Sequence, residues 1–249
     1  MKIVVIGGNS FIGSKLVTEL RRFGHQLVAA PQTSGLNNAR SEILAEMFRG
    51  TQVVIDAAKA PTLEDQAILD FFQMSGHNLL AAEALAGVRH HITLSAVGIE
   101  HMQGSAYFRA KMVQENLVKR SGIPYTILQS TQLFELMPGI AQAATTGLEI
   151  HISDAKVQPV ASDDAVAIIA KASIDKPLNA AIQIAGPECF QLNELISIFL
   201  KETGDPRKVI TDRQALYCGA ELSSFSLIPQ GNVYIGKVKF KDWLRKRAQ

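Results

Sequence analysis

Residues 1–16 of the chain read MKIVVIGGNSFIGSKL, and this stretch decides the fold. The apolar run Ile3–Ile6 predicts a compact strand, and a helix-period segment follows it. Between them lies a GxxGxxG pattern with Gly7 and Gly13 at its outer positions and Ser10 in place of the middle glycine. A tight turn from a strand into a helix N-terminus lets backbone N–H groups approach a pyrophosphate. The stretch therefore predicts a dinucleotide site.

Outward from this turn, short apolar runs alternate with helix-period segments as far as about residue 130. The expected strands are Ile3–Ile6, Gln26–Ala30, Gln52–Asp56, His91–Ser95 and Tyr125–Gln129. The expected helices are Phe11–Arg22, Arg40–Phe48, Leu63–Ala86 and Ser105–Ser121. Gly76 is a weak point of the third helix, because glycine inside a helix costs about 1 kcal/mol relative to alanine. This alternation predicts an α/β fold with a Rossmann-type, doubly wound parallel sheet.

After residue 130, apolar runs and helix-period segments alternate less regularly. Strands or extended segments are expected at Glu149–Ile152, Val157–Val160 and Ala181–Ala185, and helices at Ser162–Ser173 and Asn193–Thr203. Beyond Gly204 the chain is expected to be irregular until a basic helix near Lys241–Arg247. We therefore expect a dinucleotide-binding core over 1–130 and a smaller substrate-binding lobe over 131–249, packed on the core.

Composition excludes several classes of protein. The 249 residues hold 25 Lys+Arg against 23 Asp+Glu, with 47% hydrophobic residues, which fits a folded domain rather than a disordered chain. A net charge of +2 argues against a nucleic-acid partner. No stretch is long and apolar enough to span a bilayer, and no secretory leader is visible, so a cytoplasmic location without a membrane partner is expected. Cys189 and Cys218 are too few for a disulfide framework.

The end of the second strand bears on which dinucleotide is bound. An NAD site usually places Asp or Glu there, on the ribose 2′-hydroxyl. Here Phe23–Ala39 contains no charged residue, and the hydroxyls of Thr33 and Ser34 can donate to a 2′-phosphate. Lys15 and Arg40 lie near enough in sequence to contribute a positive charge. We therefore expect NADP, with NAD the less favoured alternative.

Three further residues point to proton chemistry. Ser95 ends the fourth strand, and Tyr107 and Lys111 form a YxxxK pattern twelve residues later. On a helix, positions i and i+4 share one face, so the phenol and the ammonium lie side by side. A neighbouring cation favours the phenolate, and a serine at a strand's carboxyl end faces the crevice where open α/β sheets bind ligands. YxxxK alone also occurs by chance on helix surfaces; the conjunction with Ser95 and the glycine turn gives it weight.

This constellation resembles the short-chain dehydrogenase/reductase family, in its atypical NmrA-like branch. Similar landmarks are NLLAAE (78–83), GVRHH (87–91), GIPYTIL (122–128), VQPV (157–160) and AGPE (185–188). The resemblance implies that Tyr107 is the acid/base, that Lys111 assists it and that Ser95 polarises a carbonyl. Relatives commonly have Arg-Pro after the fifth strand, whereas this chain has Gln129 and Ser130 there. Asn78 is interpreted as structural.

The leading hypothesis is an NADP-preferring oxidoreductase that moves hydride between the nicotinamide and a small carbonyl or alcohol. An NADP(H)-sensing regulatory protein of the NmrA type is the alternative, because some atypical members have lost the tyrosine. A sugar-nucleotide epimerase is a third hypothesis. The long helices are candidate faces of a homodimer. Residues expected to hold the cofactor are Gly7, Asn9, Ser10, Phe11, Ile12, Gly13, Thr33, Ser34, Ala57, Ala58 and Lys111.

Other polar residues are discounted. His90 and His91 face opposite sides of a strand and have no Cys or carboxylate at ligand spacing, so no metal site is expected. His101 is interpreted as a loop residue. The basic residues of 237–247 are interpreted as a solvated face.

Overall fold

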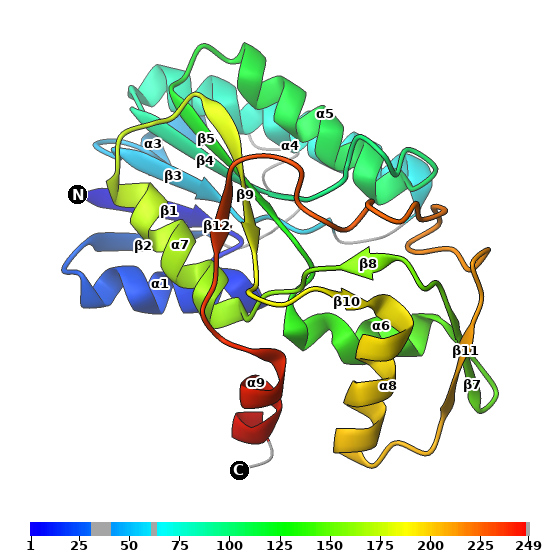
Figure 1. Ribbon diagram of the computed structural model, residues 1–249. Helices are drawn as coiled ribbons and strands as arrows, with labels where there is room; N and C mark the ends of the chain where they lie inside the picture. Colours follow the sequence, from blue (N-terminus) through cyan, green and yellow to red (C-terminus); the bar gives the residue numbers. More distant parts are fainter. Residues whose placement is uncertain (31–40, 61–63, 248–249) are drawn as a thin grey trace. The chain divides into compact units, whose positions relative to one another are not determined.

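The computed structural model describes residues 1–30, 41–60 and 64–247. Within them, seven strands form one sheet in the order β12-β9-β5-β4-β3-β1-β2 (Figure 1). The strands are β1 (Lys2–Ile6), β2 (Gln26–Ala30), β3 (Val53–Asp56), β4 (His90–Ala96), β5 (Tyr125–Ser130), β9 (Ala180–Ala185) and β12 (Val233–Ile235). β1 pairs in parallel with β2 and β3, β3 with β4, and β9 with β12. Strand order runs outward from β1 in both directions, so the expected Rossmann-type α/β fold is confirmed.

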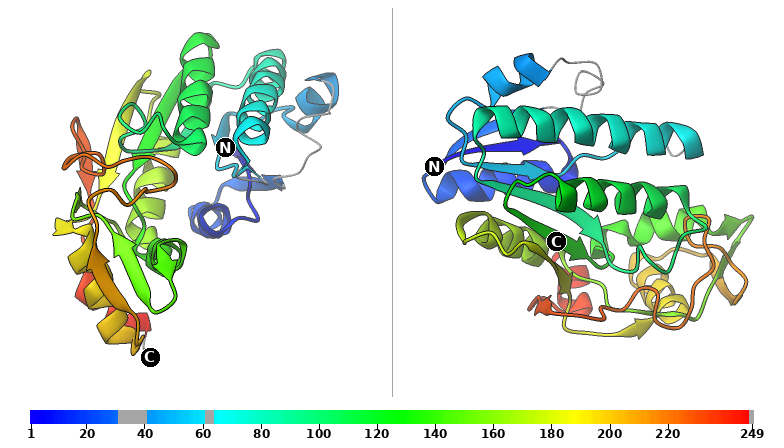
Figure 2. Two further views of the ribbon diagram at one scale, coloured as in Figure 1. Left: turned by 90° about the vertical axis from the view of Figure 1, so that its right-hand side faces the viewer. Right: turned by 90° about the horizontal axis from the view of Figure 1, so that it is seen from above.

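Helices cover both faces of this sheet. They are α1 (Phe11–Arg22), α3 (Ser41–Met47), α4 (Asp65–Ala86), α5 (Ala106–Arg120) and α7 (Ser162–Ile174). α3, α4 and α5 lie on one face, and α1 and α7 on the other (Figures 1 and 2). Ile3, Val4, Val5 and Ile6 are all fully buried, because neighbouring residues of β1 point to opposite, equally covered faces. Two-sided burial explains the unbroken apolar runs of the sequence.

Gly76 allows two helices to approach each other. α4 continues unbroken through this position, and a Cβ there would lie 2.9 Å from Cδ1 of Leu117 on α5. The helix then ends at Gly87, whose φ of 70° is in the left-handed region. The expected weak point is therefore the place where α4 and α5 pack closely.

The described residues divide into two compact units. The first comprises Met1–Ser95, Ala106–Gln129 and Val166–Ile182, and the second comprises Ala96–Ser105, Ser130–Ala165 and Gln183–Gln249. Each unit is assembled from three separate segments of the chain. The glycine turn, Ser95, Tyr107 and Lys111 all belong to the first unit.

The second unit contains short strands and helices of its own. They are the 3-10 helix η1 (Phe134–Leu136), α6 (Met137–Ala143), β6 (Thr145–Thr146), β7 (Glu149–Ile152), β8 (Lys156–Val157), β10 (Phe190–Gln191), α8 (Leu192–Thr203), β11 (Lys208–Thr211) and α9 (Phe240–Arg247). β11, β7 and β6 form a three-stranded sheet, and β10 pairs with β8. The expectation of an irregular chain between Gly204 and the last helix is wrong, because β11 and β12 lie there. Both strands are short and largely exposed, so they carry no apolar alternation to predict them.

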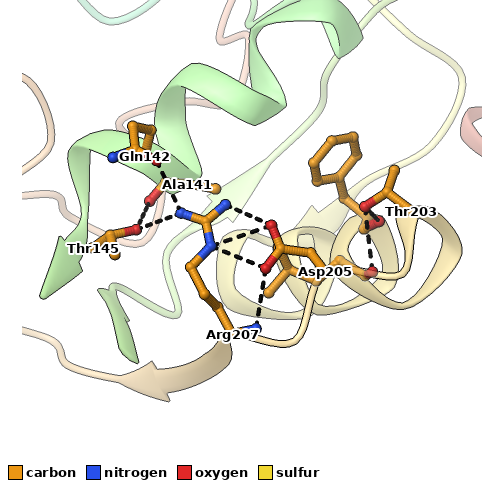
Figure 3. A network of polar contacts seen from close by, with 8 residues as sticks. Ala141, Gln142, Thr145, Thr203, Asp205 and Arg207 are labelled. Atoms are coloured by element: carbon orange, nitrogen blue, oxygen red, sulfur yellow. Dashed lines mark hydrogen bonds and ion pairs between the residues drawn. The ribbon is translucent and has the colours of Figure 1, made fainter. Parts of the chain in front are cut away.

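Arg207 joins two parts of the second unit (Figure 3). Its guanidinium donates to both carboxylate oxygens of Asp205, to Oγ1 of Thr145 at 2.7 Å and to Oε1 of Gln142 at 3.2 Å. The hydrogen bonds between Arg207 and Asp205 lower the pKa of the Asp205 carboxyl group to about 2. The loop after α8 is thereby tied to the end of α6.

Carboxylates also hold the C-terminal segment. Asp164 accepts from the backbone N–H groups of Lys237 and Val238, both at 2.7 Å, and Glu188 accepts from that of Phe240 at 2.8 Å. The Phe240 ring packs on Phe134 at 5.1 Å between centroids. The last helix is therefore anchored by its apolar face, and its basic residues are exposed.

Candidate active site

The glycine turn has the backbone geometry that its residue types require. Gly7 follows β1 with a φ of +70°, and a Cβ there would lie 2.6 Å from the carbonyl oxygen of Ala57, just after β3. A Cβ at Gly13 would overlap the carbonyl oxygen of Gly7. Side chains at either position would push the start of α1 away from the strands. The turn therefore needs glycine for its conformation at Gly7 and for close packing at Gly13.

Ser10 caps the helix that leaves this turn. Its side-chain oxygen accepts from the backbone N–H of Gly13 at 3.1 Å, and its carbonyl accepts from Ser14 at 2.9 Å. Asn9 is exposed and Phe11 is half-exposed, so the first turn of α1 is open to a ligand. The N–H groups at the start of a helix and its positive dipole end suit phosphate oxygens.

The side chain of Lys111 reaches β4 one residue before Ser95. The Lys111 ammonium donates to the backbone carbonyl of Leu94 at 2.9 Å, so it reaches the residue next to Ser95. Ser95 is buried, and within the described part of the chain its Oγ has no hydrogen-bond partner. A buried hydroxyl without a hydrogen-bond partner is energetically costly, so the position of Ser95 calls for an explanation.

Tyr107 stands one helical turn before Lys111 on α5. It is half-buried and packs against the core between the sheet and α4, with its ring edge-on to Phe108 at 5.2 Å. Tyr107 and Lys111 therefore lie on one helix, four residues apart, and the expectation that the phenol and the ammonium lie side by side stays a prediction. The catalytic roles of Ser95, Tyr107 and Lys111 stay predictions.

Burial changes the acidity of Lys111. Its side chain is 5% exposed, and Nζ lies 4.6 Å from the centre of the Phe72 ring. Removal from water lowers its pKa to about 8, against the opposing effect of Asp56 and Glu115. An amine with this pKa exchanges its proton near physiological pH.

Two residues beside Lys111 were not found by sequence reasoning. Gln114 Oε1 accepts from Lys111 at 2.9 Å, and Gln114 Nε2 donates to Oδ2 of Asp56 at 2.7 Å. Oδ1 of Asp56 accepts from the backbone N–H of Ala58 at 3.0 Å. The available signals were a carboxylate ending the apolar strand β3 and a glutamine one turn after Lys111.

His91 also has a partner that the sequence did not reveal. Its Nδ1 lies 2.9 Å from both carboxylate oxygens of Glu83 on α4, and its Nε2 lies 2.8 Å from Oγ1 of Thr93. Burial raises the pKa of Glu83. For His91, burial alone would lower the pKa, but the charge and hydrogen bond of Glu83 together with the charge of Asp56 raise it. His90 instead contacts Thr126 of β5 at 2.9 Å, so the two histidines face opposite sides as expected.

The predicted contacts to a 2′-phosphate are only partly visible. Thr33, Ser34 and Arg40 lie outside the described residues. Lys15 lies on α1, with its ammonium 5.0 Å from the centre of the Phe11 ring at the start of that helix. The NADP preference therefore stays a prediction.

Residues 7–177 match the model of a family described as NAD(P)H-binding. The chain belongs to this NAD(P)H-binding family. The match starts at the glycine turn and includes Ser95, Tyr107 and Lys111. It confirms the family expectation as far as NAD(P)H binding; the NmrA-like branch stays a prediction.

Curated relatives of this NAD(P)H-binding protein are plant enzymes. The chloroplastic divinyl chlorophyllide a 8-vinyl-reductase of rice (Oryza sativa subsp. indica) is 26% identical over 222 residues, covering 74% of this chain and 54% of the relative. The chain spans about half the length of the curated relatives it matches.

Solved structures confirm the fold of the NAD(P)H-binding protein. dTDP-4-dehydrorhamnose reductase from Bacillus anthracis, in complex with NADP, has a TM-score of 0.68 at 14% identity and covers 99% of this chain and 92% of its own. UDP-glucose 4-epimerase from Thermus thermophilus, in complex with NAD, has a TM-score of 0.70 at 16% identity over 92% of each chain. Among the described residues, no helix is both long and apolar enough to cross a bilayer.

Proposed function

We propose that the protein is an NAD(P)H-dependent oxidoreductase that interconverts a small carbonyl compound and its alcohol. One observation carries the proposal: the buried ammonium of Lys111 donates to the carbonyl of Leu94 near the end of β4, where the Ser95 hydroxyl lies buried with no hydrogen-bond partner among the described residues. Tyr107 precedes the lysine by one turn in the same compact unit as the glycine turn. This combination supplies a proton donor, a cation and a hydrogen-bond donor beside a dinucleotide site.

The cofactor fits the residues at the glycine turn. A Cβ at Gly7 or Gly13 would meet backbone atoms, so glycine keeps the turn close to the strands, and the start of α1 offers N–H groups for a pyrophosphate. We assign Asn9, Ser10, Phe11 and Ile12 to this binding surface, with Ala57 and Ala58 beside it. When bound, the reduced nicotinamide supplies the hydride.

The chain's own residues handle the proton and the oxygen. Tyr107 donates a proton to the substrate oxygen, and Ser95 donates a hydrogen bond to the same oxygen as negative charge develops there. Lys111 contributes positive charge, which favours the phenolate form of a neighbouring tyrosine, and it binds the nicotinamide ribose. The three roles need these residue types in this arrangement.

We further propose that NADP is preferred to NAD and that residues 131–249 shape the substrate pocket. The charge-free run Phe23–Ala39 supports the first part, since a carboxylate that would repel a 2′-phosphate is missing from that sequence. The rice relative is named as a vinyl-reductase and the structural neighbours act on sugar nucleotides, so both chemistries belong in the test.

The test follows NADPH and NADH oxidation against a panel of small aldehydes, ketones, nucleotide-linked ketosugars and vinyl-substituted rings. Tyr107→Phe is expected to lower kcat at least about 100-fold while NADPH binding is unchanged. Turnover of a good substrate by Tyr107→Phe at the wild-type rate would contradict the assignment. NADPH binding with no substrate in the panel would favour the NADP(H)-sensing alternative.

A further inference from the structure

We infer that Gln114 is a positioning residue that, anchored on Asp56, holds the Lys111 ammonium at the end of β4. The inference rests on the proposed function, because it assigns Gln114 a role through the lysine. It adds a residue that the YxxxK pattern does not contain. It also links the lysine to the strand that borders the glycine turn.

The hydrogen bonds form an unbroken chain through the first unit. Asp56 ends β3, where one carboxylate oxygen accepts from the backbone of Ala58 and the other accepts from Gln114. Gln114 then accepts from Lys111, which donates onward to the carbonyl of Leu94 on β4. β3, α5 and β4 are thus joined through polar atoms that are all buried or nearly so.

The amide of Gln114 can take only one orientation. An ammonium only donates and a carboxylate only accepts, so the amide oxygen must face Lys111 and the amide nitrogen must face Asp56. The opposite orientation would place N–H donors against the ammonium and an oxygen against the carboxylate. Gln114 is 2% exposed, so water cannot compensate for such a reversal. The charges on both sides therefore fix the side chain.

This arrangement fixes the direction of Lys111. An ammonium has three N–H donors, and within the described residues protein oxygens of Gln114 and Leu94 accept from two of them. The third donor remains for a hydroxyl of the cofactor or for the phenol one turn away. Without Gln114 the flexible lysine side chain would lose one of its two fixed contacts.

Gln114 also separates the positive charge of Lys111 from the negative charge of Asp56. The charged groups that act on the lysine are Asp56 from β3 and Glu115 from α5, while α4 contributes the Phe72 ring. Asp56 acts through the neutral amide of Gln114, so its charge favours the ammonium without the direct ion pair that would hold the lysine away from a ligand. Burial opposes this effect and brings the pKa of Lys111 to about 8.

Two variants separate positioning from packing. Gln114→Met keeps the approximate volume and removes both hydrogen bonds, whereas Gln114→Glu keeps an oxygen acceptor for Lys111. Gln73→Met makes the same chemical change on the exposed face of α4 and serves as the control. Thermal unfolding of each variant shows whether it is folded.

The direct readout is the titration of Lys111 in the protein without cofactor, followed by NMR of ¹³C-labelled lysine side chains. The Lys111 signal is identified by its absence in Lys111→Arg. We expect the titration midpoint to fall by about one pH unit in Gln114→Met, because the ammonium loses an acceptor, and not to fall in Gln114→Glu or Gln73→Met. The pH at which NADPH affinity weakens should shift in the same way.

The results test the positioning role of Gln114 and the proposed function separately. A midpoint in Gln114→Met equal to that of the wild type, or an equal fall in Gln114→Glu, would overturn the positioning role. Failure of the wild type to bind NADPH or NADH would instead contradict the proposed function, and the NMR titration in the cofactor-free protein would still judge Gln114. The two failures are therefore distinguishable.

Discussion

At the scale of single residues, burial rather than residue type sets the chemistry of α5. Lys111 and Lys119 lie on the same helix, but Lys119 is 42% exposed and pairs with Glu115 at 3.0 Å. Lys111 is 5% exposed, and burial lowers its pKa to about 8. The spacing of Tyr107 and Lys111 is visible in the sequence. Asp56 could not be predicted, because 58 residues separate it from Gln114 and only the fold brings them together.

The buried lysine predicts a pH dependence of stability. Its pKa is lowered from 10.5 to about 8, so the folded state binds fewer protons than the unfolded state between these values. The penalty is complete below pH 8 and disappears as pH rises to 10.5. The free energy of unfolding of the wild type, minus that of Lys111→Met, should therefore rise by up to about 3 kcal/mol across this range. Urea unfolding at pH 7.5 and 10 measures it; a difference that does not change with pH would refute the assignment.

Ser95 predicts a separation of stability from activity. Because its buried Oγ has no hydrogen-bond partner in the part of the chain that the structure describes, Ser95→Ala should change the free energy of unfolding by less than about 1 kcal/mol or raise it. Turnover should nevertheless fall about 100-fold. Ser173→Ala is the matched control: it removes a buried hydroxyl that donates to the carbonyl of Ala170 at 2.7 Å, so it should cost stability without affecting chemistry. The opposite pattern would remove Ser95 from the site.

At the scale of elements, the junction of β1 with α1 is where sequence and structure agree most closely. An apolar strand, glycines and a capping serine each act locally, so neighbouring residues suffice to predict the turn. β11 and β12 show the limit of such reasoning. β12 has three exposed residues held by pairing with β9, and that partner is about fifty residues distant in the chain.

Gly13 predicts the effect of a single methyl group at this junction. Gly13→Ala would bring Cβ onto the carbonyl oxygen of Gly7, so stability should fall by at least about 2 kcal/mol and NADPH affinity should fall with it. The matched change Gly139→Ala on α6 meets no atom within 4 Å and should be neutral or slightly stabilising. Chemical unfolding and NADPH titration test both; equal behaviour of the two variants would contradict the packing argument.

His90 on β4 predicts that the protein loses stability in acid. Burial, assisted by repulsion from His91, lowers the pKa of His90 to about 4 from 6.5. A lowered histidine pKa gives stability that is present above pH 6.5 and lost as pH falls through 4, by up to about 3 kcal/mol. In His90→Gln, the free energy of unfolding should change less with pH between 4 and 6.5 than it does in the wild type. If the free energy of unfolding fell equally with pH in both proteins, groups other than His90 would cause the loss of stability in acid.

At the scale of the whole molecule, the chain builds its first unit from separated segments. Residues 166–182 return to the unit that holds the glycine turn, and the family match likewise runs to residue 177. The division expected at residue 130 follows a change in the pattern of apolar runs and helix-period segments. That pattern does not show that residues 166–182 belong to the same unit as the glycine turn. We have proposed that residues 131–249 shape the substrate pocket, and the sequence pattern there is less regular, so the sequence predicts the cofactor more readily than the substrate.

We propose that this molecule binds its nicotinamide dinucleotide at the glycine turn. Thermal unfolding with NAD, NADH, NADP and NADPH tests it most directly, because a ligand of the native state raises stability by mass action. At a hundredfold excess over Kd, NADPH should add about 2.7 kcal/mol and raise Tm by about 5 to 10 °C, with a smaller shift for NADH. An unchanged Tm with all four dinucleotides would contradict the account.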